Sequence, residues 1–129
     1  MKLKEIKSED LLFSNGIEDD RTNTFLSLND YDWMSYRLKT RFKTLDLGIL
    51  DVEFQYFGMN YSFMDVEQIK DGTKEKYRYE YSSSVFRKHI VNFFEKHIES
   101  WNDKYAFNGE ENVINFYNEV IKIGTIIPQ

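Results

Sequence analysis

Four acidic residues are the first candidates for chemistry, because they recur at a spacing of two in two separate stretches of the chain. Asp51 and Glu53 lie in the first stretch, and Asp65 and Glu67 lie in the second. Carboxylates grouped in this way could hold a hard metal cation or attract a basic partner surface. Their alternation with apolar residues predicts that all four lie on one face of a β-sheet. What they can do therefore depends on how two strands are set side by side.

A metal site is the weaker of these interpretations. Hard cations such as Ca²⁺ take about six to eight oxygen ligands, usually from a loop that bends around the ion. Carboxylates on flat strands diverge, and the sequence has no Asp-rich loop with an internal glycine. We therefore expect no metal and no other cofactor.

A docking strip for a protein partner with a basic surface is the functional interpretation of the four carboxylates. The acidic loop Glu18, Asp19 and Asp20 is a second candidate contact for the same partner. The alternative is a solvated face whose acids are satisfied by neighbouring bases, since exposed ion pairs contribute little stability.

A hairpin over residues 34–57 must position the first two carboxylates. Apolar and polar residues alternate on both sides of Asp46-Leu47-Gly48, and the glycine suits the positive φ of a three-residue loop. With Leu47 at the tip, the expected cross-strand pairs are Phe42–Val52, Leu38–Tyr56, Lys43–Asp51 and Arg41–Glu53. Apolar residues from Tyr31 to Leu45 also recur at helical spacing, but a helix explains neither the turn nor the opposed charges.

A second hairpin positions the other two carboxylates, with Asp71-Gly72 as its two-residue turn. Its expected pairs are Val66–Tyr77, Met64–Tyr79, Glu67–Lys76 and Asp65–Arg78. Two successive hairpins give an antiparallel meander of four strands, or five if Thr24–Leu28 joins. If the two middle strands are neighbours, like charges face each other there, which costs stability.

Beyond the meander, the period of the apolar residues changes from that of a strand to that of a helix. One helix is predicted from about Ser84 to Trp101, and a second begins at Asn108, with Glu111 completing a capping box. The residues expected in the buried stripe of the second helix are Val113, Phe116, Tyr117, Val120 and Ile121.

The end of the second helix is predicted at Gly124, which is expected to cap it, and Pro128 forbids continuation. Ile126 and Ile127 are expected to fold back as an apolar tail. The predicted fold is α+β: an antiparallel meander sheet of four to five strands, followed by two helices packed on one face. One domain spans residues 1–129.

A pocket between the sheet and the helices is the alternative site. Tyr77 and Tyr79 on the inner sheet face, with His97 and Trp101 on the first helix, would supply polar groups on an apolar wall. Such a pocket would suit a small-molecule binder or a simple enzyme, with His97 as a base or a ligand contact. The competing interpretation is a packed core in which a neutral His97 bonds to a tyrosine.

Composition narrows the class of protein. The 129 residues carry a formal net charge of −5, which argues against direct nucleic-acid binding. The absence of cysteine excludes disulfides and thiolate metal sites. No apolar run long enough for a signal peptide or a membrane span is present, so we expect a cytoplasmic protein. Phosphate loops, nucleophile elbows and His-Glu-x-x-His are also absent, so an enzyme has no support from motifs.

A small acidic domain rich in Lys, Asn and Ile is similar in general character to bacterial or phage inhibitors and to toxin-neutralising immunity proteins. This likeness implies a non-enzymatic protein-binding module. The oligomeric state stays open, although a free sheet edge at Thr24–Leu28 or at Lys74–Tyr81 could pair with another chain.

Overall fold

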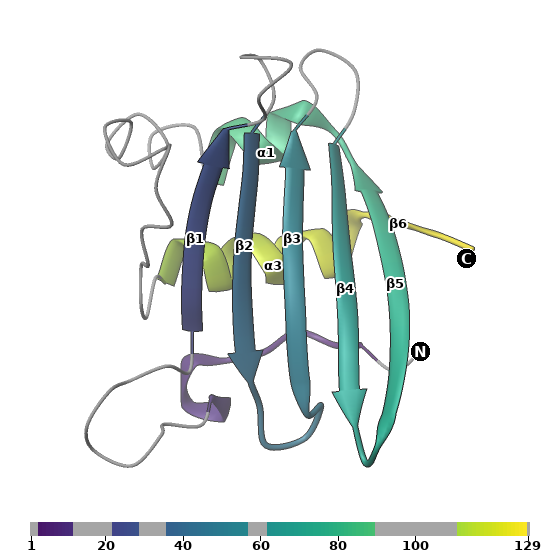
Figure 1. The fold of residues 1–129 in the computed structure, drawn as a ribbon. Helices are drawn as coiled ribbons and strands as arrows, with labels where there is room; N and C mark the ends of the chain where they lie inside the picture. Colours follow the sequence, from purple (N-terminus) through teal and green to yellow (C-terminus); the bar gives the residue numbers. More distant parts are fainter. Residues whose placement is uncertain (1–2, 12–21, 29–35, 57–61, 90–110, 129) are drawn as a thin grey trace.

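The computed structural model describes residues 3–11, 22–28, 36–56, 62–89 and 111–128 (Figure 1). In chain order they form the 3-10 turn η1 (Ser8–Asp10), strands β1 (Thr22–Leu28), β2 (Tyr36–Lys43), β3 (Ile49–Tyr56), β4 (Ser62–Lys70) and β5 (Thr73–Tyr81), helices α1 (Ser83–His89) and α3 (Glu111–Ile123), and strand β6 (Thr125–Ile127). Figure 1 shows a curved sheet with both helices on the same face. The α+β meander followed by two helices is confirmed.

Within the described residues the sheet has six strands in the order β1-β2-β3-β4-β5-β6, and each is antiparallel to the next. The strand predicted at Thr24–Leu28 joins as β1. Ile126 and Ile127 fold back as predicted, but as a strand rather than a tail, because Thr125–Ile127 pairs with Arg78–Glu80 at the edge of β5. The backbone donors and acceptors of an unpaired edge explain why the chain adds a strand there.

Gly124 ends α3, but it does not take the left-handed conformation that a glycine cap implies. Its N–H donates to the Val120 carbonyl at 2.8 Å. A Cβ at this position would lie 2.6 Å from the Val120 oxygen and 3.2 Å from the Glu80 oxygen. Glycine is therefore needed for the close approach of backbones where the helix turns into β6.

The register between β4 and β5 is the predicted one. Lys70 pairs with Thr73, Glu67 with Lys76 and Asp65 with Arg78. Asp71 and Gly72 both have positive φ, at 52° and 78°, as a two-residue type I′ turn requires.

The register between β2 and β3 differs from the prediction by two residues. Arg41 lies opposite Asp51, rather than opposite Glu53, and Lys39 takes the place opposite Glu53. Contacts of the loop hold this register: the Thr44 hydroxyl donates to the Gly48 carbonyl at 2.8 Å and accepts the Leu47 N–H at 2.9 Å, and the Gln68 amide donates to the Leu47 carbonyl at 2.9 Å. Because a shift of two preserves the alternation, each side chain stays on its predicted face.

The core lies between the sheet and α3. The stripe predicted for this helix, Val113, Phe116, Tyr117, Val120 and Ile121, is buried. Phe116 stacks on Phe54 with ring centroids 4.1 Å apart, and Phe86 of α1 stacks on Tyr56 at 4.3 Å. The rest of the predicted first helix, including its end, and the predicted start of the second lie outside the described residues.

The N-terminal segment is held against α3 by side-chain hydrogen bonds. The Asn118 amide accepts the Ile6 N–H and donates to the Ile6 carbonyl, both at 2.7 Å. The Tyr117 hydroxyl donates to the Lys4 carbonyl at 3.0 Å. With Leu3 and Ile6 buried, this segment covers apolar surface that the meander leaves open.

Candidate functional site

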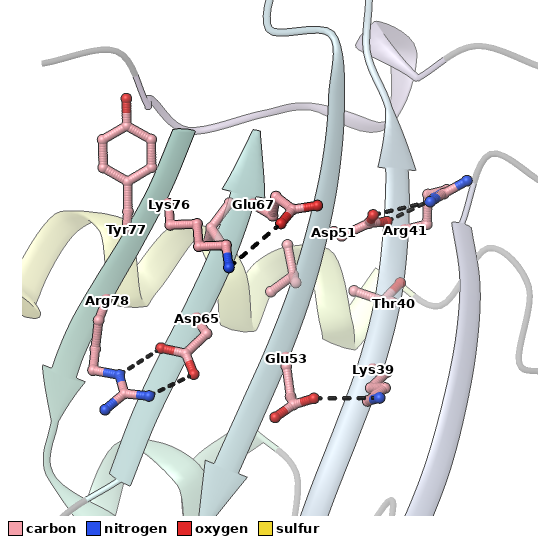
Figure 2. Close-up of a pocket in the computed structure, with 12 residues that line it drawn as sticks. Lys39, Thr40, Arg41, Asp51, Glu53, Asp65, Glu67, Lys76, Tyr77 and Arg78 are labelled. Carbon is pink, nitrogen blue, oxygen red and sulfur yellow. Dashed lines mark hydrogen bonds and ion pairs between the residues drawn. The ribbon is translucent and has the colours of Figure 1, made fainter. Parts of the chain in front are cut away.

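The sheet face opposite the helices carries the four predicted carboxylates, and we call it the open face. It consists of the alternate residues of β2 to β5 that point away from α3, and both described helices lie on the other face of the sheet (Figure 1). Figure 2 shows the side chains at its centre. Its members are Arg37, Lys39, Arg41, Lys43, Ile49, Asp51, Glu53, Gln55, Phe63, Asp65, Glu67, Ile69, Lys74, Lys76, Arg78 and Glu80. Among these, bases outnumber acids by seven to five, although the whole chain is acidic.

Cross-strand pairing sorts the central charges into two rows that run across the strands. We call Lys39, Glu53, Asp65 and Arg78 the Glu53 row, and Arg41, Asp51, Glu67 and Lys76 the Asp51 row. Each row has the order basic, acidic, acidic, basic. A hollow of about 750 Å³ lies over both rows, and we call it the groove. Thr40, Val52, Val66 and Tyr77 also line it, although the side chains of the first three are buried and that of Tyr77 is partly buried against the core.

The acids of the Glu53 row form hydrogen bonds and ion pairs with neighbouring side chains. Arg78 holds Asp65 through two bonds of 2.6 and 2.9 Å, and the Gln55 amide donates to Glu53 at 2.6 Å and to Asp65 at 3.1 Å. Lys39 and Arg37 each approach Glu53 to 3.5 Å. Sequence reasoning missed Gln55, although its place two residues after Glu53 puts it on the same face.

The acids of the Asp51 row are less fully satisfied. Arg41 holds Asp51 through two bonds of 2.6 and 2.9 Å, but the Lys76 ammonium lies 4.0 Å from Glu67. That lysine is 75% exposed, so it restrains Glu67 weakly. No amide in the described residues bridges the two carboxylates of this row as Gln55 bridges the other two.

The expectation that like charges face each other in the middle of the sheet is confirmed. Asp51 lies opposite Glu67, and Glu53 lies opposite Asp65. These side chains are between 24% and 34% exposed, so their repulsion is only partly screened by water.

The residues of the alternative pocket are divided by the structure. Tyr79 is 1% exposed in the ring-filled core, its hydroxyl has no hydrogen-bond partner among the described residues, and burial raises its pKa. Tyr77 is partly buried against this core, and burial and a 2.6 Å hydrogen bond to Glu75 raise its pKa to about 12. His97 and Trp101 lie outside the described residues, as does the predicted contact loop Glu18, Asp19 and Asp20.

A contact between the two helices was not predicted. His89 Nε2 lies 2.8 Å from Glu119 Oε1, and its ring stacks on Phe116 with centroids 5.6 Å apart. Lys88 approaches the same oxygen to 3.1 Å. The hydrogen bond to His89, followed by that to Lys88, lowers the pKa of Glu119. The spacing of these residues from one another in the sequence gave no signal of this contact.

Other kinds of site have no geometry to support them in the part of the chain that the structure describes. There, no group of three or more His, Asp or Glu side chains is placed to hold a metal ion. None of the described helices has the length and apolar character needed to cross a membrane.

Comparison with known proteins adds no relationship: no family model, no curated protein and no solved structure matches the chain.

Proposed function

We propose that this protein is a non-catalytic binding module that docks a partner protein on its open face. The observation that carries the proposal is the pair of opposed acids in each row, Asp51 with Glu67 and Glu53 with Asp65. The small acidic chain suits an inhibitor or immunity-type protein, which acts by covering a surface of its partner.

The stability cost of the opposed acids supports this proposal. Like charges directly opposite on neighbouring strands destabilise a sheet by roughly 0.2–1 kcal/mol for each pair. Gln55 and the neighbouring bases offset this cost for Glu53 and Asp65. A sheet that needed only stability would avoid the pair of Asp51 with Glu67, whose nearest base to Glu67 lies 4.0 Å away. Costs of this kind are tolerated where a surface has a function.

The position of the acids supports a cationic contact. Four carboxylates in the middle of the groove make its centre negative, while bases stand at both of its ends. A cationic side chain of a partner would gain most over Asp51 and Glu67, because Glu67 is the acid with the most distant base. Such complementarity sets the register and the rate of association.

Affinity capture from a lysate of the cell that produces the protein tests this function. The bait is the full chain, compared with a variant that combines Asp51→Asn with Glu67→Gln. The matched control combines Glu5→Gln with Glu9→Gln, which removes the same charge from exposed positions of the N-terminal segment. All three baits are first compared by urea unfolding, so that a change in folding is recognised.

We expect a stoichiometric partner on the wild-type and control baits, reduced at least about tenfold on the open-face variant. Retention of that partner by the folded open-face variant would show that the site is wrong. Capture of no partner by the wild-type bait would contradict the binding function itself.

A further inference from the structure

Resting on the proposed function, we propose that the groove takes one α-helix of the partner, lying across β2 to β5. The helix presents acidic, basic, basic and acidic side chains at positions i, i+3, i+7 and i+10. Its two central bases lie over β3 and β4, and its two outer acids lie over β2 and β5.

The order of charge along both rows leads to this occupant. Lys39 and Arg41 stand at one end of the groove, and Lys76 and Arg78 stand at the other. A broad basic surface would place its cations against these four bases as well as over the central acids. Only a narrow element, cationic in its middle and anionic on both sides, meets attraction at every strand.

The spacing of side chains along a helix matches the spacing of the four strands that carry the charges. Neighbouring strands lie about 4.8 Å apart, so the distance from β2 to β5 is about 14 Å. Positions i, i+3, i+7 and i+10 share one face of a helix and span about 15 Å at 1.5 Å per residue. Four side chains of one helix therefore fall over four strands in order.

An extended strand does not match the same spacing. Side chains on one face of a strand recur about every 6.8 Å. A strand lying across the groove therefore places only three side chains over the four charged strands, β2 to β5. Nucleic acid does not fit either, because its phosphates would lie against the central carboxylates.

Two designed peptides test the occupant directly. Both are alanine-based helices of about 18 residues, long enough to be partly helical in water. One carries Glu, Lys, Lys and Glu at i, i+3, i+7 and i+10, and the other carries Lys, Glu, Glu and Lys at the same positions. The two have the same composition and net charge, so only the order of charge differs. Binding of each labelled peptide to the full chain is measured by fluorescence anisotropy at low salt.

Charge exchange within one row gives the matched protein variant. Arg41→Asp combined with Asp51→Arg keeps an attractive cross-strand pair and removes the repulsion between Asp51 and Glu67, so the variant is expected to fold. It reverses the charge order at one end of the groove. A variant with Lys4→Asp and Asp46→Lys exchanges another ion pair, away from the groove, and serves as the control.

We expect the Glu-Lys-Lys-Glu peptide to bind the wild type and the control at least about tenfold more tightly than the reversed peptide does. The exchange in the Asp51 row should abolish this preference. Equal affinity for the two peptides, binding of neither, or a preference that survives the exchange would overturn the helix assignment. If capture of a partner still depends on Asp51 and Glu67, the proposed function stands while the helix assignment fails.

Discussion

Asp51 on β3 lies directly opposite Glu67 on β4, so that two carboxylates face each other in the middle of the sheet. Replacing Glu67 by glutamine removes the repulsion and gives up only a weak contact with Lys76 at 4.0 Å. We expect Glu67→Gln to raise the free energy of unfolding by about 0.2–0.5 kcal/mol. Urea unfolding at neutral pH measures the change.

The matched substitution in the other row should act in the opposite direction. Glu53 receives a hydrogen bond from Gln55 and two ion pairs, from Arg37 and Lys39. Glu53→Gln should therefore lower the free energy of unfolding by about 0.5–1 kcal/mol. Equal effects of the two substitutions would contradict the distinction between the rows.

Gly48 and Gly72 allow a steric contact to be separated from backbone conformation. Both have positive φ, at 77° and 78°. A Cβ on Gly48 would clash with the Ile69 carbonyl oxygen, whereas a Cβ on Gly72 meets no atom within 4 Å. Gly72→Ala should cost about 1 kcal/mol of stability, and Gly48→Ala about 3 kcal/mol, because the backbone of β4 must also move.

Chemical denaturation of the two alanine variants gives this comparison. A difference below about 1 kcal/mol would show that the loop moves away from β4 without cost.

Asn118 should be more important than its place on a helix suggests. Asn118→Ala leaves the N–H and the carbonyl of Ile6 without their partner, at a cost of about 2–3 kcal/mol. Asn115→Ala, at an exposed position of the same helix, is the control and should change stability by less than about 0.5 kcal/mol. Thermal unfolding of both variants checks the prediction.

Glu119 should make the free energy of unfolding depend on pH in the acidic range. Its pKa lies below the ordinary value of 4.5, so it contributes stability that is present above its pKa in the unfolded chain and is lost as the pH falls through its pKa in the folded protein. The difference in free energy of unfolding between wild type and Glu119→Gln should therefore become smaller as the pH falls from about 5 to about 3.

The order of causes behind the Glu119 pKa can be tested in the same series. His89 lowers this pKa more than Lys88 does. His89→Gln should therefore remove more of the pH dependence than Lys88→Ala. The reverse order, measured by urea unfolding across that pH range, would contradict the assignment.

Local turn chemistry decided which strand pairs could be predicted from the sequence. Asp71-Gly72 permits a single two-residue turn, so the register of β4 and β5 is the predicted one. Residues 44–48 separate β2 from β3, and contacts of the folded loop hold the observed register, namely those of the Thr44 hydroxyl and the bond from the Gln68 amide to the Leu47 carbonyl. The face of each charge was therefore predictable, but the partner of each charge was not.

Features that depend on distant residues gave no local signal. Strand β6 has three residues, which is too short for a periodicity, and its pairing follows from where α3 delivers the chain. Gln55 could be placed on the open face, but its bridge between two carboxylates depends on the orientation of its amide. The pairing of Asn118 with Ile6 joins residues 112 positions apart.

That last pairing has a consequence for how the protein folds. Each hairpin of the meander joins neighbouring residues, so the central strands can assemble quickly. The hydrogen bonds between Asn118 and Ile6 instead close a loop of 112 residues. The conformational entropy of that loop is lost before any contact between its ends is gained. Removing these hydrogen bonds by Asn118→Ala should therefore leave the refolding rate almost unchanged and raise the unfolding rate. The hydrogen bonds between Ile6 and Asn118 therefore affect the unfolding rate, and so the lifetime of the native state, while the hairpins determine the folding rate.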